Sequence, residues 1–286
     1  MNKFLQNTII FFGILAIINA YFFYIVYENY FVQYERIDKN YTTYLLSDSH
    51  GLPIAKYSEK YDFYNFSAAS DSYVDMRRKL QYLIDNSKIQ RLILTVDEHN
   101  LSQYRNYSNN IDRSNYFATV DDYNSIFDYI TGQYIERYIP LINPKSRDII
   151  KIYFQPRRTA SGPTVLWNEF DANEKEAFTQ QRIDKQFTNS GRSQLQLEAL
   201  REIINICNQN NIELIGLKYP LTKEYLNGIK DSSFRADSIL ISKKIKVCDF
   251  STLYENQDSL FANQDHLNER GGQLFTEVLF EKCVKE

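Results

Sequence analysis

The chain has 286 residues, of which 43% are hydrophobic and 15% aromatic, so it can bury a large core and is not a disordered tail. Lysine and arginine number 33 against 36 aspartate and glutamate, and this net charge of −3 provides no basic field for a nucleic-acid partner. The three cysteines, Cys207, Cys248 and Cys283, lack metal-ligand spacing and allow one disulfide at most. We expect them to be inert core residues.

The N-terminal region contains an apolar segment long enough to cross a membrane. Residues 8–27, TIIFFGILAIINAYFFYIVY, carry no charge, and about 20 apolar residues match the roughly 30 Å of a bilayer core. No small-residue cleavage site follows, which favours an uncleaved anchor over residues 1–34 and leaves a cleavable signal peptide as the alternative.

The few charges that flank this segment predict its orientation. Lys3 precedes the apolar run, whereas Glu28 and Glu35 follow it. The positive-inside rule therefore predicts a single-pass protein of the cell membrane. Residues 35–286 would form one domain that faces the periplasm or the cell exterior.

The rest of the chain alternates predicted strands with predicted helices. Runs rich in β-branched and aromatic residues predict strands at 41–46, 62–66, 91–96, 212–219 and 246–250. Amphipathic spacing predicts helices at 72–86, 195–210 and 268–282. This alternation is typical of an α/β protein with a parallel sheet. The stretch from about 102 to 192 is far longer than an ordinary connection and predicts an inserted cap or substrate-binding region.

Each of the three histidines lies just after a predicted strand or next to an acidic residue. They occur in SDSH at 47–50, in DEHN at 97–100 and in NQDHLN at 263–268. Because the carboxyl ends of parallel strands meet at one edge of a sheet, we expect the three segments to converge on one crevice. For any single histidine, a surface or capping role remains the alternative.

The segment LLSDSHG, at 45–51, resembles the first block of the SGNH/GDSL hydrolase superfamily. In that family the serine of a Gly-Asp-Ser sequence is the nucleophile, so the resemblance assigns this role to Ser49, with Asp48 and His50 as neighbours. It also implies a three-layer α/β/α sandwich of the flavodoxin-like type. The chemistry supports the assignment independently, because a serine at a strand end can expose its hydroxyl to a base and its backbone N–H to an oxyanion.

Two further segments resemble the oxyanion-binding blocks of the same family. In NFSAAS, at 65–70, Ser70 stands where a glycine commonly supplies a backbone N–H. In VDEHN, at 96–100, Asn100 matches the oxyanion asparagine, and His99 is its rival for that role. The resemblance therefore implies an oxyanion hole made by the N–H groups of Ser49 and Ser70 and by the side chain of Asn100.

The segment FANQDHLNERGG, at 261–272, resembles the family's last block, Asp-x-x-His. The resemblance makes His266 the general base, but Asn263 occupies the place of the usual acid and the carboxylate is Asp265, so either residue could orient the imidazole. The continuation His-Leu-Asn-x-x-Gly is similar to that of membrane-anchored polysaccharide O-acetylation proteins.

This resemblance implies a serine-dependent esterase or O-acyltransferase that acts on acyl groups, chiefly acetyl, of a cell-surface or exported polysaccharide. The substrate would be an acyl ester or a glycan, and a membrane protein that delivers the acyl group is a candidate partner. No metal and no organic cofactor is implied.

Two other interpretations stay open. Asp48-x-His50 also resembles the opening of calcineurin-type metallophosphoesterases, although only His99 and His266 remain as further histidine ligands. A catalytically silent relative that binds glycans or partner proteins fits the four departures from the family pattern, at Ser47, Ser70, Asp97 and Asn263.

The predicted insertion contains a pair of arginines and the single tryptophan of the chain, Arg157, Arg158 and Trp167. These side chains could hold an acidic, ring-shaped sugar. A solvated basic pair and a core aromatic residue are the alternative.

Overall fold

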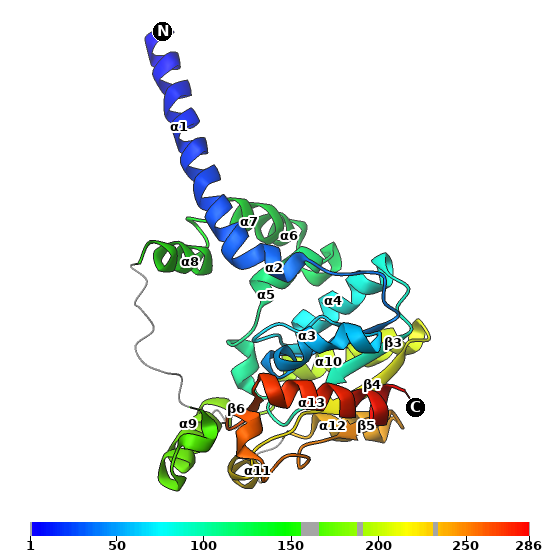
Figure 1. Cartoon of the computed structure of the whole chain (residues 1–286). Coiled ribbons are helices and arrows are strands. Elements are labelled where there is room, and N and C mark those ends of the chain that lie inside the picture. The colour runs from blue at the N-terminus through cyan, green and yellow to red at the C-terminus, as the bar shows by residue number, and fades with distance from the viewer. Residues whose placement is uncertain (1, 156–165, 188–190, 231–233, 286) are drawn as a thin grey trace. The chain divides into compact units, whose positions relative to one another are not determined.

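The computed structural model describes residues 2–155, 166–187, 191–230 and 234–285 (Figure 1). The chain divides into two compact units, one of residues 1–37 with 112–162 and one of residues 38–111 with 163–286. The predicted insertion over 102–192 is therefore shared between the units, since residues 112–162 group with the N-terminal helix, whereas residues 102–111 and 163–192 group with the sheet. The division into an anchor over 1–34 and one domain over 35–286 stays a prediction.

The larger unit is built on a five-stranded parallel sheet in the order β2-β1-β3-β4-β5, which is the flavodoxin-type order (Figure 1). All five predicted strands are confirmed, each within two residues of its expected ends. Their bounds are Thr43–Leu46 for β1, Tyr64–Asn65 for β2, Arg91–Thr95 for β3, Glu213–Lys218 for β4 and Val247–Asp249 for β5.

Helices cover both faces of this sheet. Helices α4 and α10 pack against each other, while α13 packs against the opposite face, so the expected three-layer α/β/α sandwich is confirmed. The predicted start of α4 is confirmed by a capping box, in which the Asp75 carboxylate accepts from the backbone N–H of Ser72 at 2.8 Å. The helices of this unit are α3 (Ala55–Ser58), α4 (Tyr73–Asn86), α9 (Ala172–Phe187), α10 (Gln194–Gln209), α11 (Lys223–Ile229), α12 (Ala236–Ser242) and α13 (Glu269–Leu279).

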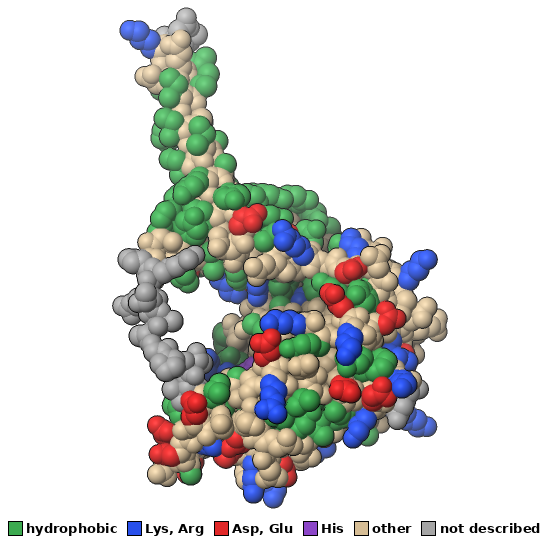
Figure 2. Space-filling view, viewed as in Figure 1, with side chains coloured by type: hydrophobic (Ala, Val, Ile, Leu, Met, Phe, Trp, Pro, Cys, Tyr) green, Lys and Arg blue, Asp and Glu red, His purple; other side chains and the backbone are tan. Residues whose placement is uncertain are grey.

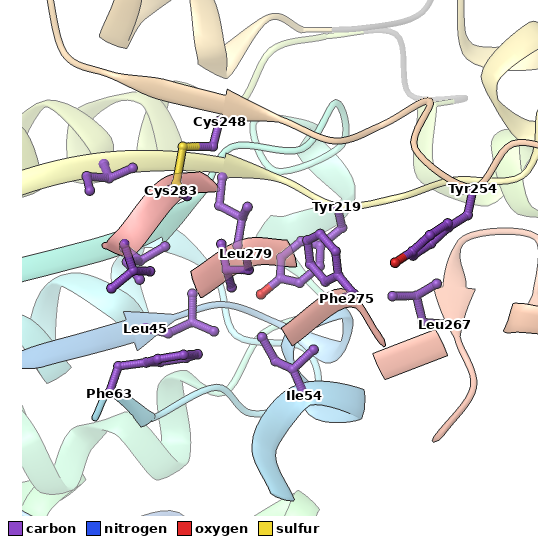
Figure 3. Close-up of a cluster of buried hydrophobic side chains, with 14 of the residues drawn as sticks. Leu45, Ile54, Phe63, Tyr219, Cys248, Tyr254, Leu267, Phe275, Leu279 and Cys283 are labelled. Carbon is purple, nitrogen blue, oxygen red and sulfur yellow. A yellow bond between two sulfur atoms is a disulfide. The ribbon is translucent and has the colours of Figure 1, made fainter. Parts of the chain in front are cut away.

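Figure 3 shows the core between the sheet and α13. Leu45 of β1 and Tyr219, which follows β4, are fully buried there together with Phe275 and Leu279 of α13. Large apolar side chains thus fix the last helix of the chain against the sheet.

The cysteines are only partly as expected. Cys248 of β5 and Cys283, in the helical turn η10 (Phe280–Val284), form a disulfide that ties the sheet edge to the end of the chain (Figure 3). The expectation of three inert core cysteines is therefore wrong for this pair, because tertiary packing brings two residues 35 positions apart together. Cys207 is a buried free thiol, and its burial raises its pKa to about 12.

Helix α13 lies very close to the helical turn η2 (Ser49–Ile54) that follows β1. A Cβ atom at Gly272 would lie 2.2 Å from the backbone oxygen of Pro53, so only glycine permits this approach. Asn268 caps α13 by accepting from the N–H of Gly271 at 2.9 Å. This close packing links two distant segments, because η2 begins at Ser49 and α13 directly follows the segment that carries His266.

The smaller unit joins the N-terminal helix to the first half of the insertion. Helix α1 (Asn2–Val26) continues through the π-helical turn η1 (Tyr27–Phe31) into α2 (Val32–Glu35). The insertion contributes α6 (Ile126–Ile130), η7 (Thr131–Ile135), α7 (Glu136–Tyr138) and α8 (Pro144–Phe154), and α5 (Ile111–Ser114) lies at the sequence boundary between the units. Arg137 pairs with Glu35 at 2.5 Å, and Ile150 packs with Val26 and Phe31.

Among the described residues, one helix is long and apolar enough to cross a membrane, and it covers residues 3–35 with a mean hydropathy of 2.4 over its most apolar window. A signal sequence passes the same test of length and composition. The expected spanning segment is thus present as a continuous helix.

Candidate active site

Polar residues that follow β1 and β3 meet a short hairpin at the carboxyl edge of the sheet. β1 is followed by Asp48, Ser49 and His50, and β3 is followed by residues 97–100. The hairpin consists of β6 (Phe261–Asn263) and β7 (His266–Leu267). Its position corresponds to the switch point between β1 and β3, where sheets of this order bind ligands.

The hydroxyl of Ser49 lies against the imidazole of His266. The distance from Ser49 Oγ to His266 Nε2 is 2.8 Å, although the two residues are 217 positions apart. Ser49 begins the turn η2, and the Asp48 carboxylate caps this turn by accepting from the N–H of His50 at 3.0 Å. The sharp change of direction after β1 therefore presents the serine hydroxyl at the edge of the sheet.

The hairpin positions His266 through a two-residue turn, Gln264–Asp265. Asn263 pairs with His266 across the turn, and its side-chain oxygen accepts from the N–H groups of Asp265 at 3.1 Å and of His266 at 3.0 Å. The Thr222 hydroxyl donates to the backbone oxygen of Gln264 at 2.8 Å. Asn263 thus holds the turn in which the acid and the imidazole are neighbours.

Two oxygens lie within hydrogen-bond distance of the second ring nitrogen of His266. Its Nδ1 is 2.8 Å from Asp265 Oδ1 and 3.0 Å from Asn263 Oδ1. A carboxylate is the stronger acceptor for this N–H, because charge-assisted hydrogen bonds are roughly twice as strong as neutral ones. With Nδ1 protonated, Nε2 is free to accept from the Ser49 hydroxyl, as a serine–histidine–acid arrangement requires.

Asp265 is buried and surrounded by positively charged groups. Its Oδ2 is 2.8 Å from Arg182 Nε, 3.3 Å from Gln186 Nε2 and 3.7 Å from His50 Nε2. Burial by itself raises the pKa of Asp265, but His266, His50 and Arg182 outweigh burial and hold this pKa well below its usual range. Asp265 therefore stays ionised next to His266.

His50 connects this acid to a second carboxylate. Its Nδ1 is 2.6 Å from Asp97 Oδ2, and Asp97 also accepts from the N–H of Tyr219 and from the hydroxyl of Thr95, both at 3.0 Å. Burial lowers the pKa of His50, but Asp97 and Asp265 outweigh burial and raise it to about 9. His50 is therefore a buried cation between two carboxylates at neutral pH.

This cation affects the pKa of His266. Burial lowers the pKa of His266, and the positive charges of His50 and Arg182 lower it as well, against the opposite effect of Asp265. The net pKa lies below the usual value of a histidine. His266 is consequently neutral at pH 7 and able to accept a proton.

His99 belongs to a separate ion-pair cluster. Its Nε2 lies 3.0 Å from Asp48 Oδ2, and an Arg105 guanidinium nitrogen contacts both, at 2.6 Å from the His99 nitrogen. Burial and the charge on His50 lower the pKa of His99 to about 4, so this imidazole is neutral. His99 is thus held by Asp48 and Arg105, and its ring lies 5.2 Å from the ring of His50.

The same cluster bears on the metallophosphoesterase interpretation. The ligand atoms of Asp48, His50 and His99 lie within 4.8 Å of one another, as a metal site requires. However, Arg105 places a guanidinium against Asp48 and His99, and His50 directs its Nδ1 to Asp97. Burial lowers the pKa of Arg105 to about 9, so its guanidinium is protonated at pH 7 beside two of these candidate ligands.

The structure gives the conformation of Ser70 and the surroundings of Asn100, the two other residues expected to bind an oxyanion. Ser70 adopts φ = 70°, the left-handed conformation that favours the glycine of the family pattern. Asn100 is buried, and its Oδ1 lies 3.5 Å from the Thr95 hydroxyl. Both residues therefore remain candidates for oxyanion donors.

A pocket of about 490 Å³ adjoins the hairpin, with Asn263 and Gln264 in its wall. Three aromatic residues line it, Trp167, Phe170 and Phe178, together with Arg182 and Asn263. Trp167 is 1% exposed and belongs to the core, so it offers little surface to a ligand. Arg157 and Arg158, the other residues considered for sugar binding, lie outside the described residues.

Sequence reasoning missed several residues of this site. Tyr219 directly follows β4, so its place in the sequence, just after a predicted strand, already indicated that it lies at the carboxyl edge of the sheet. Arg182 and Gln186 lie four residues apart on one face of α9 and reach Asp265 only because α9 packs beside the hairpin. Arg105 likewise carries no local motif.

No protein-family model and no curated protein matches this chain. Solved structures resemble it at low sequence identity. A protein assigned to the G-D-S-L lipolytic family from Desulfitobacterium hafniense is 12% identical, covering 85% of this chain and 99% of its own, with a TM-score of 0.43. A GDSL-like lipase from Bacteroides thetaiotaomicron is 6% identical, covering 91% and 98%, with a TM-score of 0.45. A protein assigned as an acylhydrolase from Bacteroides fragilis is 8% identical, covering 91% and 97%, with a TM-score of 0.42.

Proposed function

We propose that this protein is a serine-dependent esterase or O-acyltransferase that acts on ester-linked acyl groups, chiefly acetyl, of a cell-surface or exported polysaccharide. The observation that carries the proposal is the 2.8 Å contact between Ser49 Oγ and His266 Nε2, with Asp265 at 2.8 Å from the other ring nitrogen. This is the geometry of nucleophile, base and orienting acid that acyl transfer requires.

In the first half-reaction, Ser49 Oγ attacks the ester carbonyl carbon while His266 Nε2 takes the hydroxyl proton. Asp265 stabilises the imidazolium, and the N–H groups of Ser49 and Ser70 with the Asn100 amide bind the oxyanion. Collapse of the tetrahedral intermediate breaks the ester C–O bond, and His266 returns the proton to the leaving alcohol. The product is an acyl group on Ser49.

In the second half-reaction, water or a sugar hydroxyl attacks the acyl-serine and gives its proton to His266. Attack by water completes a hydrolase cycle, and attack by a sugar hydroxyl completes a transferase cycle. The aromatic pocket suits a glycan, because Phe170 and Phe178 offer flat apolar surface while Gln181 and Gln264 offer amide groups at its wall.

The location outside the cytoplasm is part of the same proposal. Helix α1 is long enough to anchor the chain in the cell membrane. The disulfide between Cys248 and Cys283 suits an oxidising compartment such as the periplasm or the cell exterior. A membrane protein that hands over an acyl group would then meet Ser49 on that side.

The test is labelling of the detergent-solubilised chain by a fluorophosphonate, together with cleavage of a chromogenic acetyl ester, with and without chelator. We expect labelling and turnover that resist the chelator and disappear in Ser49→Ala. Ser242→Ala is the matched control, because Ser242 is an exposed serine on α12.

Each other outcome identifies an alternative. Equal labelling of Ser49→Ala and the wild type would show that the nucleophile is misassigned. Absence of labelling in every variant would favour the silent glycan- or partner-binding relative, and turnover that the chelator abolishes would favour the metallophosphoesterase.

A further inference from the structure

The smaller unit exposes many large apolar side chains that do not pack within it. Their exposed fractions reach 71% for Phe127, 64% for Ile152 and 56% for Phe154. In the larger unit, exposed large apolar residues such as Leu195 and Ile241 lie singly. Figure 2 shows hydrophobic side chains gathered over α1 and over the helices at its base. An apolar surface of this kind marks a contact with a partner or a membrane.

The exposed side chains form a stripe on one helical face. Elements α6, η7 and α7 follow one another without a break, and Ile126, Ile130, Tyr134 and Tyr138 recur along them every fourth residue. Residues at this spacing share one face of a helix. All four are exposed, so most of this apolar face is left uncovered within the smaller unit, although Tyr138 also lies against Phe23 of α1.

The end of this helix lies beside the apolar part of α1. The side-chain amide of Asn19 donates to the backbone oxygen of Tyr138 at 2.8 Å, and the rings of Phe23 and Tyr138 are 5.2 Å apart. Asn19 is eight residues before Tyr27, where the apolar run ends. At roughly 1.5 Å per residue this is about 12 Å, close to half of a ~30 Å hydrocarbon core.

The hydrogen bond between Asn19 and Tyr138 pairs two polar groups that would find no water inside a membrane. In hydrocarbon, an unpaired amide or backbone carbonyl costs several kcal/mol, so each polar group needs a partner within the protein. The Tyr138 carbonyl is the last of α7, and helix ends leave such carbonyls without an intrahelical partner. If α1 spans a membrane, Asn19 and the helix end satisfy each other within the hydrocarbon region.

We propose that residues 126–154, here called the collar, are embedded in the leaflet that surrounds the C-terminal half of α1, with lipid acyl chains against the exposed apolar stripe. This inference rests on the proposed anchoring by α1. The occupant is lipid rather than a protein because the stripe is continuous with α1 and its end is bonded to the span itself. Helix α8 is the last part of the collar. Its Ile150 packs with Val26, whereas Ile152 and Phe154 are exposed.

The experiment measures lipid contact residue by residue in the full-length protein. Single cysteines replace Phe127, Ile142 and Phe154 and carry an environment-sensitive fluorophore, and the protein is reconstituted alone in phosphatidylcholine vesicles with spin-labelled lipid as quencher. Ile14→Cys in α1 is the positive control and Ile241→Cys on α12 is the water-exposed control. Native Cys207 stays unlabelled, because it is buried with a pKa of about 12 and the other two cysteines form a disulfide.

We expect the three collar positions to show blue-shifted emission and to lose most of it to the quencher, as Ile14→Cys does. Emission at the collar positions that matches Ile241→Cys, with Ile14→Cys quenched, would overturn the inference and point to a protein partner for the stripe. Absence of quenching at Ile14→Cys would instead overturn the proposed anchor, and the collar with it.

Discussion

Raising the pH from 6.5 to 9 should destabilise the larger unit, because one buried histidine must lose its proton. His50 lies between Asp97, at 2.6 Å, and Asp265, at 3.7 Å, and its side chain is 2% exposed. These carboxylates outweigh burial and raise its pKa from 6.5 to about 9. The folded chain therefore keeps a proton at this site in a pH range where the unfolded chain has already released it.

The magnitude follows from the difference in pKa. A pKa that is higher in the folded than in the unfolded state stabilises the fold fully below pH 6.5, and this stabilisation is lost as the pH rises through about 9. At about 1.4 kcal/mol per pH unit, the loss over this range is about 3 kcal/mol. His99 and His266 have lowered pKa values in the folded state, so only their unfolded forms titrate near pH 6.5; they oppose the loss by at most about 0.4 kcal/mol each, and His50→Gln shares this contribution.

The assay is urea unfolding of the detergent-solubilised chain at a series of pH values, followed by tryptophan fluorescence. Trp167 is the single tryptophan and lies buried in the core of the larger unit, so its emission reports the unfolding of that unit. In His50→Gln the slope between pH 6.5 and 9 should disappear, although the variant is less stable at pH 6.5. A free energy of unfolding that is flat in the wild type, or that falls equally in both proteins, would refute the reasoning.

Two further changes test the acid and the disulfide. Asp265→Asn should lower ester cleavage by about 10³- to 10⁴-fold, because the imidazolium loses its carboxylate partner and the amide can hold the wrong tautomer. The control is Asp258→Asn, which removes a pair with Lys175 at 2.6 Å and should retain activity. Equal losses of activity in the two variants would contradict the role of Asp265. Replacing Cys248 and Cys283 by alanine should lower the free energy of unfolding by about 3–4 kcal/mol, the value expected for a closed loop with a separation of 35 residues, and an unchanged urea midpoint would contradict the bridge.

Local patterns were sufficient for much of the fold. Each predicted strand is a short apolar run bounded by polar residues, and the sequence LQLEALREIINICNQN repeats its apolar residues at helical spacing before β4. Such patterns reflect the burial of one face of a helix or of a whole short strand, and this burial depends on residues that are close together in the sequence. The insertion was recognised by its length, but its division between the two units was not, because partners distant in the chain decide where each half packs.

The same distinction applies to the site. Ser49, Asp265 and His266 stand in short motifs after a strand or within a turn, so a pattern in the sequence identified them as candidates. Their environment was not accessible in this way. Arg182 comes from α9, and the charge that His50 carries depends on Asp97 and Asp265, which are 47 and 215 positions away in the chain.

The apolar N-terminal helix, the order of strands and helices, and the candidate serine and histidine could be predicted from the sequence, because each depends on residues within one short segment. The tertiary structure was needed to show which carboxylate lies within hydrogen-bond distance of His266, which cysteines pair, and which apolar residues of the collar remain exposed. These features depend on distances between groups far apart in the chain, and such distances are set by the packing of the whole fold.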